Sequence, residues 1–153
     1  MYKVGFWISS VLLCLASVSY AQTSNSLNCT NIPNVPTKPQ DAEISAILSS
    51  GNENIVVCDN IIPFLNPFIA SLKLTGVQQQ INQTCKLIDH ITVRLEIINR
   101  RLDCGLVASV QEARSLNLML GNDQVSNRVL NGVKTRLLVI KNRLQVIITP
   151  PVP

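Results

Sequence analysis

Residues 77–103, VQQQINQTCKLIDHITVRLEIINRRLD, contain the clearest helical pattern in the chain. Their apolar side chains recur at intervals of seven, three, four, three and four residues. This spacing is the heptad seam of a helix that packs lengthwise against other helices. The seam residues are Ile81, Ile88, Ile91, Leu95, Ile98 and Leu102, with Thr84 in the one weak position. Residues 77–103 are therefore predicted to form one long helix.

Two further apolar patterns follow toward the C-terminus. The first predicts a helix over about 106–120, which Gly121-Asn122 would end and after which Asp123 would cap the next helix. The second predicts a helix over about 124–148 that is apolar on more than one side, and so buried against several neighbours or a partner. Because Ile and Val favour strands, a strand over 143–148 is the alternative. The apolar faces comprise Leu106, Val110, Ala113, Leu116 and Leu120 in the first helix, and Leu130, Val133, Leu137, Ile140, Leu144 and Ile147 in the second.

The first half of the chain predicts shorter helices. Thr37-Lys38-Pro39-Gln40 resembles a helix start, with a Thr cap and a first-turn Pro, and Gly51 is expected to end that helix. Residues 54–58 form a short apolar run that is interpreted as a small strand or an extended loop. Asn66-Pro67 repeats the pattern of a cap followed by proline, so a short helix is expected there, ended by Gly76.

These patterns together predict an all-α fold, a small antiparallel helical bundle held by two disulfides. The bundle domain is expected over residues 39–149 and is followed by a Pro-rich tail, 150–153. It is preceded by an extended arm rich in Pro, Ser and Asn, residues 22–38, tied down only at Cys29. A parallel coiled-coil dimer is disfavoured, because the basic residues that flank the last seam would face each other. The oligomeric state is left open.

The start of the chain is typical of a secreted protein. Lys3 precedes an almost wholly apolar run from Val4 to Val18, and Ala21 lies at the −1 position of a cleavage site. Residues 1–21 are therefore predicted to be a signal peptide. No later run is long and apolar enough for a membrane span, so the mature protein is expected to be extracellular.

Four cysteines remain after removal of the signal peptide: Cys29, Cys58, Cys85 and Cys104. An even number in an oxidising compartment predicts two disulfides. A metal site is disfavoured, because no pair has CxxC spacing and the chain has a single histidine.

The long helix limits how these cysteines pair. Cys85 and Cys104 would lie roughly 28 Å apart along a continuous helix, far beyond the ~7 Å limit for bridged Cα atoms. Two pairings remain: Cys29–Cys85 with Cys58–Cys104, or Cys29–Cys104 with Cys58–Cys85. The second is preferred, because a hairpin at Gly76 would bring Cys58 nearer in level to Cys85.

Two sequons predict N-glycosylation, at Asn28 in Asn28-Cys29-Thr30 and at Asn82 in Asn82-Gln83-Thr84. Asn82 falls one residue after a seam position, so its side chain is expected to face outward, as a glycan requires.

Charge is unevenly placed along the chain. The last segment, from Gln124 onward, has five basic residues and no acid. Glu96, Asp103 and Glu112 are the acids expected to neutralise part of this charge internally. The candidate partner-binding residues are Arg128, Lys134, Arg136, Lys141 and Arg143.

Several function classes are disfavoured by the residues present. Catalysis is not expected, because the chain lacks GxSxG, HExxH, P-loop and GxGxxG patterns, and no cofactor is implied. His90 is interpreted as a half-exposed helical residue, since its neighbour Asp89 points away from it on a helix. Nucleic-acid binding is not expected, because the mature chain keeps only Phe64 and Phe68 as aromatics, and their four-residue spacing predicts a core pair.

Three non-enzymatic roles remain. The first is a secreted helical glycoprotein that binds an acidic protein or receptor through its basic last helix. The second is an extracellular carrier that takes a lipid or other apolar ligand into an aliphatic bundle, with Arg136 or Arg143 pairing an acidic headgroup. The third is a bulk structural component of a secreted fluid.

Overall fold

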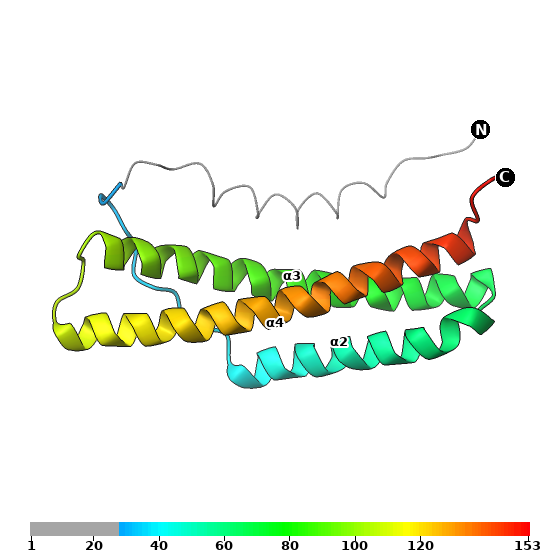
Figure 1. The fold of residues 1–153 in the computed structure, drawn as a ribbon, viewed down its shortest axis with the longest axis horizontal. Coiled ribbons are helices and arrows are strands. Elements are labelled where there is room, and N and C mark those ends of the chain that lie inside the picture. Colours follow the sequence, from blue (N-terminus) through cyan, green and yellow to red (C-terminus); the bar gives the residue numbers. More distant parts are fainter. Residues whose placement is uncertain (1–27) are drawn as a thin grey trace.

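The computed structural model describes residues 28–153 as an extended arm followed by three long helices (Figure 1). The elements are α2 (Asp41–Ile61), the short 3-10 helix η2 (Ile62–Phe64), α3 (Pro67–Asp103) and α4 (Val110–Ile148). No strand occurs within residues 28–153, so the all-α prediction is confirmed for this part of the chain. The predicted signal peptide and residues 22–27 of the arm lie outside the described residues.

The three helices form an antiparallel bundle in which α3 and α4 are the principal pair (Figure 1). A tight turn through η2 joins α2 to α3, and residues 104–109 join α3 to α4. The shorter α2 packs against both long helices along the half of the bundle where α3 begins and α4 ends. The C-terminus therefore lies at the same end as the α2–α3 turn.

Local signals explain where the two long helices begin and end. Asn66 caps α3, with its Oδ1 accepting from the Ile69 amide, and proline occupies the first turn. At the start of α4, the Ser109 hydroxyl accepts from the Glu112 amide while the Glu112 carboxylate accepts from the Ala108 amide, 2.5 Å away. Gly105 follows α3 with a φ of 64°, the left-handed conformation that commonly terminates helices.

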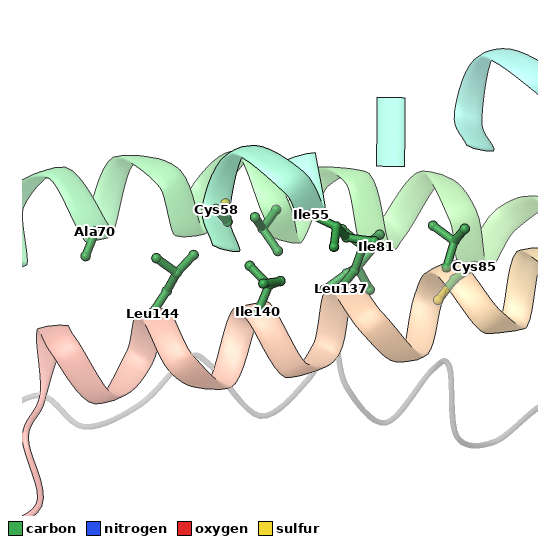
Figure 2. Packing of buried hydrophobic residues seen from close by; sticks show 10 residues of the cluster. Ile55, Cys58, Ala70, Ile81, Cys85, Leu137, Ile140 and Leu144 are labelled. Carbon is green, nitrogen blue, oxygen red and sulfur yellow. The ribbon is translucent and has the colours of Figure 1, made fainter. Parts of the chain in front are cut away.

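The core is aliphatic and lies mainly between α3 and α4 (Figure 2). The predicted seam of α3 is confirmed at Ile81, Ile88, Ile91 and Ile98, which are buried, whereas Leu95 and Leu102 are half-buried. The predicted seam of α4 is buried at Leu130, Val133, Leu137, Ile140 and Leu144, and Ile147 is half-buried. Burial of this seam is the main driving force for the bundle.

Glycine was expected to end three helices, and in each case this prediction is wrong. Gly51, Gly76 and Gly121 lie inside α2, α3 and α4, so residues 106–148 contain one long helix from Val110 rather than two. The chain continues through each glycine because packing of the apolar face on either side outweighs the roughly 1 kcal/mol penalty of a helical glycine. The alternatives of a strand or loop at 54–58 and of a strand at 143–148 are likewise wrong, since both segments are helical.

Gly51 has a specific packing role. It is buried, and a Cβ at this position would lie 2.7 Å from Val133 Cγ1. The missing side chain therefore permits α2 to approach α4 closely.

Two further local predictions are wrong. The first helix begins at Asp41 rather than next to Thr37, and no side chain caps it, because residues 37–40 stay extended along α3. Phe64 and Phe68 are not core residues: they are 85% and 69% exposed at the α2–α3 end of the bundle. The apolar groups that fill the core come from the heptad seams instead.

The described arm is held at several points, not at Cys29 alone as predicted. It runs antiparallel to α3, and four α3 side chains donate hydrogen bonds to its backbone carbonyl oxygens. The pairs are Arg100 with Asn28 at 2.9 Å, Arg101 with Pro33 at 3.1 Å, Arg94 with Pro36, and His90 with Thr37 at 2.8 Å. The three arginine bonds are charge-assisted, and the four bonds together order an extended segment that has no secondary structure of its own.

One disulfide, Cys29–Cys104, joins described residues, where two were predicted. It has a Cα–Cα distance of 5.6 Å and ties the arm to the end of α3. Cys29–Cys104 is one of the two bridges in the preferred pairing. The other bridge of that pairing, Cys58–Cys85, is wrong, because Cys58 has a free, buried thiol.

The axial register of α2 against α3 explains why Cys58 does not reach Cys85. Gln80 bonds the Ser50 hydroxyl at 3.0 Å and the Ile47 carbonyl at 3.2 Å, which places Gln80 beside this turn of α2. Cys58 lies eight residues beyond Ser50 in one direction, and Cys85 lies five residues beyond Gln80 in the other. At about 1.5 Å per residue the two are roughly 20 Å apart along the bundle, beyond the ~7 Å limit for a disulfide.

Candidate functional site

Two segments without an acidic residue lie next to each other in the bundle. Residues 60–88 form the α2–α3 turn and the first part of α3, and residues 124–153 form the last part of α4 and the tail. Because α3 and α4 run antiparallel, these segments meet over the same half of the molecule (Figure 1). We call them together the basic half. Its basic residues are Lys73, Lys86, Arg128, Lys134, Arg136, Lys141 and Arg143.

The rest of the described chain has the opposite balance, with five basic and nine acidic residues. Four of these nine acids, Asp41, Glu43, Glu53 and Asp59, lie on α2, which packs along the basic half and offsets part of its charge. With seven cations against the four carboxylates of α2, the basic half keeps an excess of three positive charges, so charge is unevenly distributed along the bundle.

The five predicted partner-binding residues all lie on α4, but they are not equivalent. Arg128, Arg136 and Arg143 are exposed, whereas Lys134 and Lys141 are half-buried. The structure adds two cations that sequence reasoning missed, Lys73 and Lys86 on α3. The sequence signal for these two lysines is the absence of acidic residues from 60–88. That signal indicates a shared basic surface only once α3 is known to pack beside the acid-free part of α4.

Internal neutralisation differs from the prediction. Glu96, Asp103 and Glu112 pair with none of the α4 cations, because they lie in the other half of the bundle or at its far end. Instead Asp59 on α2 pairs with Arg143 at 2.5 Å, and Asn52 accepts from Arg136 at 3.2 Å. Both partners of the ion pair are about half exposed, so the pair contributes little to stability.

A groove of about 600 Å³ opens between α3 and α4 within the basic half. Its walls combine hydroxyl and amide groups with two aliphatic side chains and a single charged group, Lys141. The α3 wall consists of Ser71, Leu74, Thr75, Gln78, Gln79 and Asn82, and the α4 wall of Lys141, Gln145, Ile148 and Thr149.

A buried ion pair lies in the other half of the molecule. Arg94 Nε donates to Asp123 Oδ2 at 2.8 Å, with the two side chains 5% and 0% exposed. Asp123 is thus not a helix cap, as predicted, but a partner that fixes α4 against α3. Its Oδ1 has no hydrogen-bond partner in the described part of the chain, while Arg94 also donates to the Pro36 carbonyl. Removing either charge would leave the other uncompensated in a buried site.

His90 is exposed on α3, close to the prediction of a half-exposed residue. Its Nε2 donates to the Thr37 carbonyl, so that nitrogen carries the hydrogen and holds the arm. Along residues 28–153 no group of three or more His, Cys, Asp or Glu is placed to hold a metal ion.

The free thiol of Cys58 is 1% exposed. Burial raises the pKa of this thiol above its usual 9.0, with the charge of Lys73 opposing the shift. A protonated, enclosed thiol is a poor nucleophile, so Cys58 acts as a small apolar core residue.

Both predicted glycosylation residues are exposed. The Asn28 amide oxygen accepts from the amide and hydroxyl of Thr30, and Asn82 lies on the solvent side of α3, where it accepts from Gln78 at 2.9 Å. The Thr84 hydroxyl of the second sequon is fully buried and donates to the Gln80 carbonyl. Asn82 also lines the groove.

Within the described residues, no helix has the length and apolar character needed to cross a bilayer. Comparison of the chain with protein-family models, with curated proteins and with solved structures gives no match in any of the three.

Proposed function

We propose that the protein is a secreted, non-enzymatic helical glycoprotein that acts by binding an acidic protein partner through its basic half. The observation that carries this proposal is the packing of the two acid-free segments, 60–88 and 124–153, against each other. The seven cations of this half exceed the four carboxylates of α2, and an excess of positive charge steers acidic partners during encounter.

Arg128 and Arg136 are the residues best placed to contact such a partner. Both are exposed, and neither pairs with a carboxylate of the described chain. Guanidinium groups present a planar fork that matches carboxylates in two-point hydrogen bonds. Arg143 is expected to contribute less to partner binding, because its guanidinium already pairs with the Asp59 carboxylate.

The carrier hypothesis takes a different form in this fold. The space between the helices is filled by two clusters of aliphatic side chains, so an apolar ligand inside the bundle has no support from the described core. The headgroup partners that the sequence suggested, Arg136 and Arg143, do not line the groove. Ligand binding as the alternative function therefore rests on the groove between α3 and α4.

The proposal is tested by removing equal charge from the two halves of the molecule. The variant R128Q/R136Q loses two exposed cations of the basic half, and the control R114Q/K38Q loses two cations elsewhere. We expect the wild-type protein to bind immobilised poly-L-glutamate at low salt, with binding that weakens steeply as salt rises. R128Q/R136Q should bind several-fold more weakly than R114Q/K38Q at equal ionic strength.

Equal binding by the two variants would contradict a localised site, since net charge alone would then account for the attraction. Absence of binding by the wild-type protein at low salt would contradict the proposal outright and favour a bulk role in the secreted fluid. Mass spectrometry of the secreted protein tests the remaining parts of the proposal, namely cleavage after Ala21 and glycans on Asn28 and Asn82.

A further inference from the structure

The groove between α3 and α4 has a polar, cationic end and an apolar end. Figure 2 shows Leu137 level with Ile81, and Leu144 nearer Ala70, so residues late in α4 lie beside residues early in α3. Lys141 comes one turn after Leu137 and Ile148 one turn after Leu144, so in this antiparallel arrangement Lys141 lies nearer Gln78 and Ile148 nearer Ser71. The α3 wall from Ser71 to Asn82 is about 16 Å long, since a helix rises about 1.5 Å per residue.

Most polar groups of the walls are already satisfied within their own helix. The Thr75 hydroxyl donates to the Ser71 carbonyl, the Thr149 hydroxyl to the Gln145 carbonyl, and the Gln78 amide to Asn82. These groups need no ligand and leave the wall neutral.

Lys141 differs from the other wall residues. Its side chain is half-buried, and its ammonium has no hydrogen-bond or carboxylate partner in residues 28–153. No acidic residue lies anywhere in the two segments that form the groove. A partly desolvated cation without a counter-ion favours an anionic ligand at this end.

The opposite end of the groove leads to exposed apolar surface. Leu74 and Ile148 line the groove, and Phe68 lies seven residues before Thr75, two turns earlier on the same face of α3. Phe68 and its neighbour Leu72 are 69% and 58% exposed. An apolar chain leaving the groove at this end would cover surface that is otherwise in contact with water.

From this arrangement we infer that the groove binds an anionic single-chain lipid, with its head group at Lys141 and its apolar chain along Leu74 and Ile148 toward Phe68. The volume of about 600 Å³ falls within the range of small-ligand sites, and one cation at one end with aliphatic side chains at the other matches an amphiphile. The exposed Asn82 lies at the polar end, so a glycan there would leave the apolar end open.

The inference is independent of the acidic-partner proposal, because it depends on Lys141 and the groove and not on Arg128 or Arg136. The probe is dodecanoate, titrated into the secreted protein in a calorimeter below the concentration at which the probe forms micelles. K141Q should weaken dodecanoate binding about tenfold, the typical worth of one charge-assisted bond. K134Q is the matched control, since Lys134 is also half-buried, lies seven residues earlier on α4 and does not line the groove.

Two further measurements separate the head group from the chain. Dodecan-1-ol has the same chain without the charge, so its affinity should be equal in wild type, K141Q and K134Q. T75W, a substitution at an exposed wall position, should weaken both probes by filling the groove. No heat with dodecanoate, equal loss in K141Q and K134Q, or undiminished binding in T75W would each overturn the inference.

Discussion

Substitution of Gly51 by alanine would have two opposite effects on stability, a gain in helix propensity and a steric clash with α4. In an exposed helix the change would stabilise the protein by about 1 kcal/mol, because alanine is the better helix former. Here the new Cβ would lie 2.7 Å from Val133 Cγ1, well inside an ordinary contact of 3.4–4 Å. Val133 is buried and β-branched, so its methyl group has little freedom to move aside.

Relief of this clash requires α2 and α4 to separate, and Leu137 and Gln80 stand close behind, at 3.9 and 3.7 Å. Overpacking of this kind costs about 1–3 kcal/mol. A contact this short belongs in the upper part of that range, about 2–3 kcal/mol, and the propensity gain of about 1 kcal/mol offsets part of it. We therefore expect G51A to lower the free energy of unfolding by about 1–2 kcal/mol, or Tm by about 3–8 °C. Urea denaturation followed by far-UV circular dichroism measures the change.

The matched control is G76A. Gly76 is also in mid-helix but is exposed, and no atom lies within 4 Å of the place that an alanine Cβ would take, so alanine there should stabilise by up to about 1 kcal/mol. The double variant G51A/V133A should lose less stability than the sum of its single variants, because V133A removes the clashing methyl group. A G51A variant as stable as G76A would refute the close approach of α2 to α4.

Three other predictions follow from the buried groups and the disulfide. Asp123→Asn should destabilise the protein by about 3–5 kcal/mol in urea titrations, because it leaves the Arg94 charge unpaired, and R94M/D123L should recover most of that loss. Loss of the Cys29–Cys104 bridge, which closes a separation of 75 residues, should cost about 2–4 kcal/mol and raise amide exchange in the arm; unchanged exchange would contradict its anchoring role. The raised pKa of Cys58 means that the unfolded thiol ionises first, so stability should fall as pH rises above 9.0 in wild type but not in Cys58→Ala, a comparison made by thermal unfolding.

Sequence periodicity was sufficient for the long helices and for most of the core. The seam of α3 and that of α4 were recognisable because an amphipathic helix repeats its buried face every three to four residues. The long continuous helix also excluded a Cys85–Cys104 bridge, and Cys29–Cys104 followed from the preferred of the two remaining pairings. These are local properties, governed by the geometry of a single helix.

Helix boundaries at glycine were predicted poorly, for a physical reason. Gly51, Gly76 and Gly121 have the composition of helix ends, yet the chain passes through all three as helix. A glycine penalty of about 1 kcal/mol is small beside the apolar burial on either side, which sequence reasoning does not measure. Phe64 and Phe68 were predicted to be core residues but are exposed, because a four-residue spacing places them on one helix face without indicating whether another element covers that face.

The helical class, the heptad seams and the acid-free last segment could all be predicted from local patterns, since each is a property of residues close together in the chain. Three features follow instead from how the helices pack. A second acid-free segment, from α3, lies beside that of α4; a groove between them contains Lys141, which has no partner within residues 28–153; and Arg94 and Asp123 meet in the interior. These features depend on the axial register between the antiparallel helices. This register is set by contacts between residues far apart in sequence, such as Gly51 and Val133, and no local pattern encodes it.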